Sequence, residues 1–318
     1  MSPEDRRVWR FIGAVALCMA LSVPLSMALG VQYDYTLTHV ALGGALLGAL
    51  CGMAGTFAVL RGQSLIGDTL SHAALPGVAL AFLLFGREPL ALLLGAAATG
   101  GLGILLVNWL SSTTRLKQDA AMGIVLAAFF AIGVALLSYI QGRADARQAG
   151  LDKFIFGQAA AIIARDVVIL GAACLLIGAL LLAFWKEFKL LTFDPDFARV
   201  NGLPTGWLNG LLSTLIVIVC VIGLQLAGVI LMVGLLIAPA VAARQWTRRL
   251  EQMIVLAMLF GAFSGGSGAV LSALERGLPT GPLMIAVACG LVLVALLFAP
   301  QRGVLWQLRQ RRRLRGEV

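Results

Sequence analysis

The chain has 318 residues, of which 60% are hydrophobic and only 12% are charged. Soluble domains are about 45–50% apolar and about 25% charged, so this composition excludes an ordinary soluble globule. At roughly 20 residues for each membrane-spanning helix, the length allows about ten spans and no sizeable soluble domain. The net charge of +9 fits either nucleic-acid binding or basic loops that orient membrane helices, and the position of the charges decides between them.

Long apolar runs follow one another along the whole chain, each of a length that can cross a bilayer as a helix. The sequence therefore predicts an all-α polytopic membrane protein, with about 8–10 transmembrane helices in a single transmembrane domain over residues 1–318. The region 208–243 is short for two spans, so a partly re-entrant segment there is the alternative. The predicted spans lie near 9–29, 39–60, 65–85, 90–110, 120–140, 166–185, 208–226, 228–243, 252–272 and 281–299.

Basic residues gather on one side of these predicted spans. With the N-terminus placed in the cytoplasm, 18 of the 24 Lys and Arg residues fall on the inner side, as the positive-inside rule requires. The basic C-terminal tail, 302–318, then fits a juxtamembrane anchor on anionic lipid. We therefore expect both termini in the cytoplasm, a lipid membrane as the surrounding medium and no nucleic-acid partner.

Two motifs have the spacing of enzyme sites but lack a residue that the chemistry needs. The segment 62–69 has the glycine spacing of a phosphate-binding loop, but Asp68 stands where the lysine should be. Ser267 lies in a Gly-Gly-Ser-Gly sequence, but no histidine follows it to act as a base. The five cysteines lie apart from one another within apolar runs and are interpreted as packing residues. We therefore predict no catalytic residue, no enzyme activity and no bound cofactor.

The strongest candidate site combines Asp68 and His72, because ionisable groups within a membrane span are costly and usually functional. Four residues apart on a helix, they share one face, with Ser71 beside His72. A carboxylate and an imidazole together suit manganese, iron or zinc. The alternative from the residues alone is that Asp68 caps the helix and His72 bonds a neighbouring helix. The second histidine, His39, lies at the start of the preceding predicted span, 39–60. It is interpreted as an ordinary polar residue at the membrane edge.

The inner segment 239–251 is a short amphipathic stretch at the end of a predicted span. As a helix it would offer Trp246 and Leu250 as apolar anchors to a soluble partner. By itself it could equally be any basic loop. The cations around the anchors are Arg244, Arg248 and Arg249.

Several motifs together resemble the permease subunits of the manganese/zinc/iron ABC importers, the metal ABC-3 family. The most specific is the Gly-Asp-x-x-Ser-His-x-x-x-Pro-Gly element at 67–77. Weaker elements follow in the family's order at 119–124, 154–158, 224–231, 236–240 and 278–282. The resemblance covers nearly the whole chain. It implies a type II ABC importer architecture, in which two permease subunits enclose a path and two ATPase subunits dock underneath.

The resemblance also implies a function. The chain would import a divalent transition metal into the cytoplasm across the bacterial plasma (inner) membrane, Mn²⁺ first and Zn²⁺ or Fe²⁺ as alternatives. Its partners would be two copies of an ABC ATPase subunit, a second permease that is either identical or a related paralogue, and an extracytoplasmic metal-binding solute receptor. ATP hydrolysis is expected in the separate ATPase subunit.

The resemblance assigns roles to particular residues. Asp68 and His72 fall on the family's metal-associated positions, and 239–251 looks like the coupling helix. The outer element 154–158 looks like part of the surface that receives the receptor. A third metal donor stays open between Ser71, Asn108 and Gln225. The residues expected to contact the ATPase are Arg244, Trp246, Arg248 and Arg249.

Three rival functions remain. A permease of the same architecture could carry a larger metal chelate, such as a siderophore or cobalamin, and would need a wider, aromatic-lined path. An intramembrane enzyme would have to act without a nucleophile and base pair. A carrier independent of ATP would keep transporting after loss of its ATPase.

Overall fold

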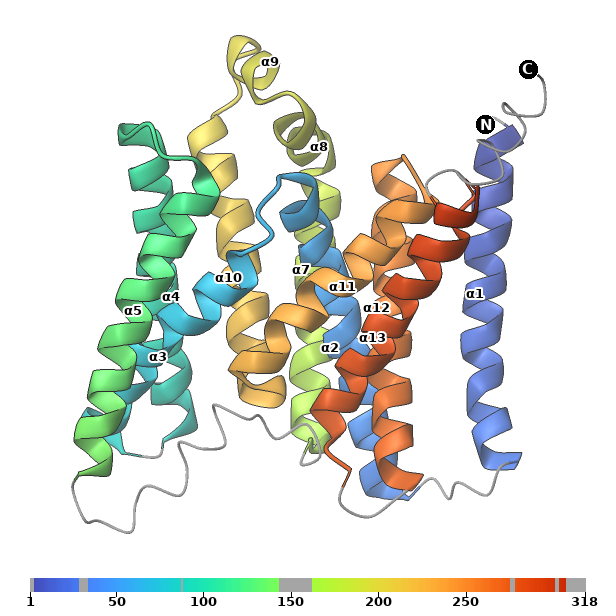
Figure 1. Ribbon diagram of the computed structural model, residues 1–318, viewed down its shortest axis with the longest axis horizontal. Helices are drawn as coiled ribbons and strands as arrows, with labels where there is room; N and C mark the ends of the chain where they lie inside the picture. Colours follow the sequence, from blue (N-terminus) through green and yellow to red (C-terminus); the bar gives the residue numbers. More distant parts are fainter. Residues whose placement is uncertain are drawn as a thin grey trace. The chain divides into compact units, whose positions relative to one another are not determined.

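In the computed structural model, all regular secondary structure of the described residues is helical (Figure 1). The structure describes residues 3–28, 34–86, 88–142, 162–274, 278–300 and 303–306. Of the predicted tail 302–318 it describes only 303–306, and the predicted outer element 154–158 lies outside the described residues. The helices are α1 (Pro3–Ala28), α2 (Tyr35–Leu60), α3 (Ile66–Phe85), α4 (Pro89–Thr113), α5 (Gln118–Gln141), α7 (Ala164–Ala183), α8 (Trp185–Phe193), α9 (Pro195–Val200), α10 (Thr205–Ala227), α11 (Val229–Trp246), α12 (Leu250–Leu274) and α13 (Thr280–Phe298).

Eight of the described helices are long and apolar enough to cross a membrane, namely α2, α3, α4, α5, α7, α10, α12 and α13. Shorter apolar stretches lie in α1, at Val8–Leu21, and in α11, at Met232–Trp246. These helices confirm the predicted all-α polytopic membrane protein. Within 208–243, α10 and α11 are separate helices that meet at Gly228, whose φ of 81° lies in the left-handed region that glycine adopts without strain.

The chain divides into two compact units. The first comprises Met1–Thr56, Ala160–Leu176 and Gly234–Val318, and the second comprises Phe57–Ala159 and Ile177–Val233. Three of the four boundaries fall within α2, α7 and α11. The single permease domain inferred from the sequence, and the bounds of its individual spans, stay predictions.

In the first unit, α2 and α12 pack backbone against backbone. A Cβ atom added to Gly48 would overlap the carbonyl oxygen of Gly261, and one added to Gly261 would overlap that of Gly48. Small residues permit this approach in lipid, where close van der Waals packing replaces the hydrophobic effect between helices. Helices α1 and α13 both pack against α12. The close contact repeats one turn to either side, where Gly44 meets Gly265 and Gly52 meets Ala257.

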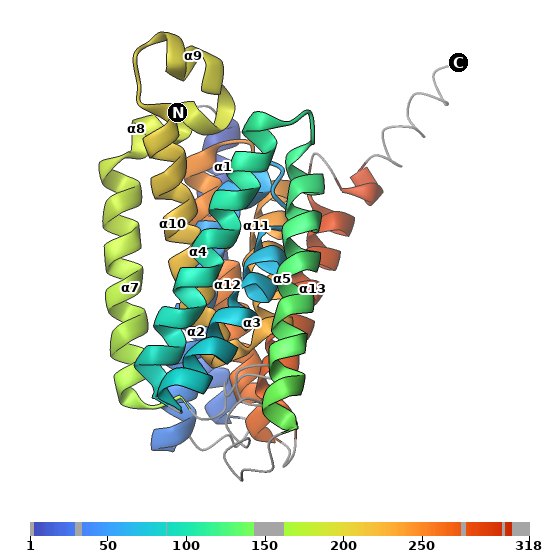
Figure 2. The same cartoon turned by 90° about the vertical axis from the view of Figure 1, so that its left-hand side faces the viewer.

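In the second unit, α3 packs against both α4 and α5, which also contact each other (Figures 1 and 2). The crossing of α3 with α4 is tight, because a Cβ atom at Gly77 would overlap the carbonyl oxygen of Gly95. On the other side, a Cβ atom at Gly133 of α5 would lie 2.8 Å from the Cβ of Leu75 and 3.3 Å from the Cδ of Pro76. Glycines at both contacts thus allow α4 and α5 to pack closely against α3. Helix α3 continues past Pro76 to Phe85.

Candidate metal centre

The position of α3 depends on the turn that ends α2. The backbone N–H of Gln63 donates to the carbonyl of Ala58 at 2.9 Å, and that of Gly62 donates to Val59 at 3.3 Å. This is a Schellman ending, and it requires the positive φ of 70° that Gly62 adopts. The chain reverses there, and α3 begins at Ile66. Asp68 therefore lies in the first turn of α3, where the helix dipole favours a negative charge.

A buried cation reinforces the same turn. The guanidinium of Arg61 donates from Nη2 to the side-chain oxygen of Asn209 on α10, and its Nη1 is buried with no hydrogen-bond partner among the residues that the structure describes. Burial lowers the pKa of Arg61 from its ordinary value, although an arginine keeps its charge across the physiological range. Arg61 thus ties the end of α2 to α10 just before the candidate site.

Asp68 and His72 contact each other on one face of α3. The Nε2 atom of His72 lies 3.2 Å from Oδ1 of Asp68, with 23% and 36% of the two side chains exposed. No side chain caps the start of α3, and among the described residues His72 makes no hydrogen bond to another helix. With a neutral imidazole, the pair carries one negative charge and two kinds of donor atom, a combination that suits a divalent transition metal.

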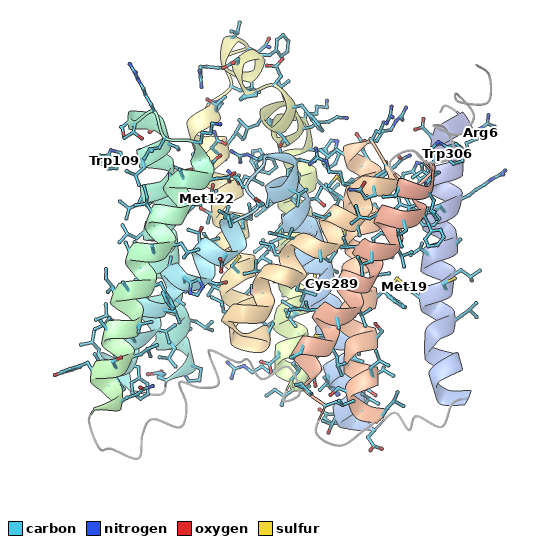
Figure 3. All side chains as sticks on the ribbon, in the orientation of Figure 1. Arg6, Met19, Trp109, Met122, Cys289 and Trp306 are labelled. Carbon is cyan, nitrogen blue, oxygen red and sulfur yellow. The ribbon has the colours of Figure 1, made fainter. Side chains whose placement is uncertain are left out.

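The neighbour of His72 on α5 locates the site along that helix. The ring of Phe130 lies edge-on to the imidazole, with centroids 4.8 Å apart and an interplanar angle of 76°. Phe130 lies midway along α5, whose whole length from Gln118 to Gln141 is a candidate membrane span. His72 is therefore level with the middle of an apolar helix. The hydroxyl of Thr69 on α3 donates to the carbonyl of Met122 at 3.5 Å. Met122 lies near the start of α5 and is labelled in Figure 3.

At the Asp68–His72 pair, two polar atoms are buried and have no hydrogen-bond partner among the described residues. They are Nδ1 of His72 and Oγ of Ser71, and Ser71 is wholly buried. A buried polar atom without a partner costs about 1–3 kcal/mol, so such atoms are rare away from sites that bind something. The equally buried hydroxyl of Ser264 on α12, by contrast, donates to the carbonyl of Gly261 at 2.9 Å. The Ser71 hydroxyl makes no such bond.

The described residues supply a partial ligand set. They contain no group of three or more His, Cys, Asp or Glu side chains that could hold a metal ion. Among the third donors suggested by the sequence, Ser71 is adjacent to the pair, Asn108 is half-buried on α4, and the side chain of Gln225 lies outside the described side chains. His39 has a hydrogen-bond partner within its own helix, because its Nδ1 lies 2.6 Å from the carbonyl oxygen of Tyr35.

The segment 239–251 consists of the end of α11, a break at 247–249 and the first residues of α12. Trp246 stacks on Phe11 of α1, with ring centroids 4.2 Å apart. Arg249 forms an ion pair with Asp5 of α1 at 2.8 Å. The other two candidate cations, Arg244 and Arg248, are exposed. The coupling role of this segment stays a prediction.

Sequence reasoning missed four residues that complete these arrangements: Phe130, Asn209, Asp5 and Phe11. Asp5 alone gave a usable signal, since an acidic residue at the start of an apolar helix needs a cation nearby. The other three are common residue types whose neighbours come from distant parts of the chain.

Comparison with known proteins places the chain in a family. The model described as "ABC 3 transport family" matches residues 32–299, so α1 precedes the matched region. The zinc transport system membrane protein TroC of Treponema pallidum is 50% identical over 282 residues, which cover 88% of this chain and 95% of that protein. The manganese transport system membrane protein MntC of Bacillus subtilis is 46% identical over 279 residues, which cover 87% of this chain and 64% of that protein.

A solved structure shares the fold. The structure of PsaBC from Streptococcus pneumoniae in complex with Fab aligns with a TM-score of 0.74 at 30% identity, over 88% of this chain and 97% of that chain. The match confirms the predicted type II ABC importer permease architecture. Together these matches also confirm the resemblance to the permease subunits of metal ABC importers: the chain belongs to the ABC 3 transport family.

Proposed function

We propose that this chain is the transmembrane subunit of an ATP-driven importer for a divalent transition metal ion, with manganese the first candidate and zinc or iron next. The contact between Asp68 and His72, beside Phe130 at the middle of α5, carries the proposal. A carboxylate within an apolar helix is costly unless a cation offsets it, and the imidazole offers that cation a second donor.

The donor set supports a transition metal and favours manganese. Carboxylate and hydroxyl oxygens suit Mn²⁺, imidazole suits several transition metals, and the soft thiolates that select other ions are absent from this face of α3. The related proteins TroC and MntC are named for zinc and manganese transport, respectively. Asp68 and His72 supply two ligands, so water, Ser71 or a second permease subunit would supply the others.

The proposed cycle is alternating access. An extracytoplasmic receptor delivers the ion, and Asp68 and His72 replace part of its hydration shell. Two ATPase subunits then close on ATP, and the segment 239–251 transmits that closure to the membrane helices. The second permease is either a copy of this chain or a related paralogue. The complex lies in the bacterial plasma membrane with both termini of this chain in the cytoplasm.

Uptake measurements on single variants test the site. In cells depleted of manganese, we expect Asp68→Ala and His72→Ala each to abolish uptake of radioactive Mn²⁺ while the protein stays in the membrane at its normal level. His39→Ala is the matched control, because the other histidine contacts only its own helix turn in the described structure, and we expect normal uptake.

The metal is tested by adding Zn²⁺ and Fe²⁺ separately as competitors of Mn²⁺ in the same cells. Manganese as the cargo predicts that neither ion competes at an equal concentration. Normal Mn²⁺ uptake in both alanine variants would reject the Asp68 and His72 site.

A further inference from the structure

The N-terminal helix α1 makes two specific contacts with the connection between α11 and α12. In the first, Oδ2 of Asp5 lies 2.8 Å from Nη2 of Arg249. Asp5 is only 5% exposed, and a buried carboxylate is stable only with a charged partner. The Arg249 side chain remains 57% exposed. The pair thus holds the guanidinium end of Arg249 against the start of α1.

The second contact is aromatic. The rings of Phe11 and Trp246 stack with centroids 4.2 Å apart and an interplanar angle of 13°. Asp5 and Phe11 lie about 9 Å apart along α1, at 1.5 Å for each residue of a helix. Two separated contacts restrict rotation of the connection as well as its distance from α1. Trp246, expected from the sequence to anchor a soluble partner, is half-buried in this structure and stacks on Phe11, and its role toward a partner stays a prediction.

The connection itself is held from within. The hydroxyl of Thr247 donates to Oε1 of Gln252 at 2.7 Å and accepts from the backbone N–H of Arg249 at 3.2 Å. Thr247 and Gln252 are 5% and 2% exposed, respectively. The backbone of Arg249 is therefore held by Thr247, and its side chain is held by Asp5. The backbone and the side chain of Arg249 therefore both have a defined orientation.

We propose that the amino-terminal part of α1 is a positioning element, which holds residues 244–249 through Arg249 and Trp246 in the orientation that presents the exposed Arg244 and Arg248 to carboxylates of the ATPase subunit. This inference rests on the proposed function, since it assumes an ATP-driven importer. The helix lies outside residues 32–299, which match the family model. The simpler alternative, in which α1 only anchors the chain in lipid, leaves its contacts with Arg249 and Trp246 without consequence.

The test uses the complete importer, reconstituted in liposomes, and measures Mn²⁺ imported for each ATP hydrolysed. For Asp5→Asn we expect this ratio to fall by up to about tenfold, the change that one lost charge-assisted hydrogen bond can produce. Asp5→Glu keeps the charge and should retain most of the wild-type ratio. Phe11→Leu keeps an apolar side chain but removes the stacking, and should lower the ratio in the same direction.

A matched control and a double variant separate positioning from general stability. Asp196→Asn breaks an exposed ion pair with Arg199 on α9, whose side chains are 88% and 72% exposed, and should leave the ratio unchanged. Because Asp5 is proposed to act through Arg249, Asp5→Asn combined with Arg249→Gln should be no worse than Arg249→Gln alone.

The outcomes distinguish this inference from the proposed function. Wild-type import with a normal ratio in both Asp5→Asn and Phe11→Leu would overturn the positioning role and leave the importer intact. Additive losses in the double variant would also overturn it. A wild-type complex that imports no Mn²⁺ on addition of ATP would overturn the proposed function itself.

Discussion

Asp68 and His72 approach each other to 3.2 Å within α3, and Asp5 and Arg249 approach to 2.8 Å between α1 and the connection before α12. The second pair is an anion with a permanent cation, so its charges cancel. The first pair is an anion with a ring that has no permanent charge, so with a neutral imidazole the pair carries one negative charge. Ser71 adds a buried hydroxyl without a partner. Two similar distances thus mark different roles: a pair that still needs a cation, and a pair that holds two segments together.

The largest expected effect is on metal affinity, which should depend on the first pair and not on the second. Asp68→Asn keeps the shape of the side chain and removes its charge. We expect Mn²⁺ affinity of the purified protein to fall at least about 100-fold, since even residues behind the ligands commonly cost 10–100-fold. The free energy of unfolding should fall by no more than about 1 kcal/mol, because the variant loses the favourable interaction of the carboxylate with the dipole of α3 and its charged contact with His72. Isothermal titration calorimetry and a melting curve check both expectations, and unchanged affinity would contradict the role of Asp68.

The next effect concerns stability, which Asp5→Asn should lower more than Asp68→Asn does. We expect the free energy of unfolding to fall by about 1–2 kcal/mol, a value reduced from that of a fully buried pair because Arg249 is 57% exposed. Denaturation in detergent micelles measures this change. Mn²⁺ affinity should stay at the wild-type value, and a large loss of affinity would show that the two pairs do not have separate roles.

The smallest effect concerns Ser71. Replacing this serine with alanine removes a buried hydroxyl that has no protein partner, so the free energy of unfolding should not decrease. If the hydroxyl contributes a ligand, Mn²⁺ affinity should fall about fivefold, equivalent to one modest polar interaction.

Ser264→Ala is the matched control, because this equally buried serine donates to the carbonyl of Gly261. The control should lose about 1 kcal/mol of stability and no metal affinity. Equal stability losses in the two serine variants would contradict the distinction between them.

Much of the fold could be predicted from the sequence because the bilayer imposes a simple length rule on apolar helices. The pairing of Asp68 with His72 could be predicted for a similar reason, since a spacing of four residues brings side chains together on any helix. The contact of His72 with Phe130 could not, because it depends on the register between α3 and α5. That register follows from the close approach of Gly133 to Leu75 and Pro76, which local patterns do not specify.

The sequence alone determined a polytopic helical membrane protein, its resemblance to metal ABC permeases and the two residues that lie one helical turn apart, because each depends on composition or on spacing within one element. Tertiary structure alone decided which polar groups find partners. It joined Asp5 to Arg249 and Phe11 to Trp246, which lie more than 230 residues apart in the sequence, and it left Ser71 buried without a partner among the described residues. The physical reason is that satisfying a buried polar group depends on which distant elements pack around it.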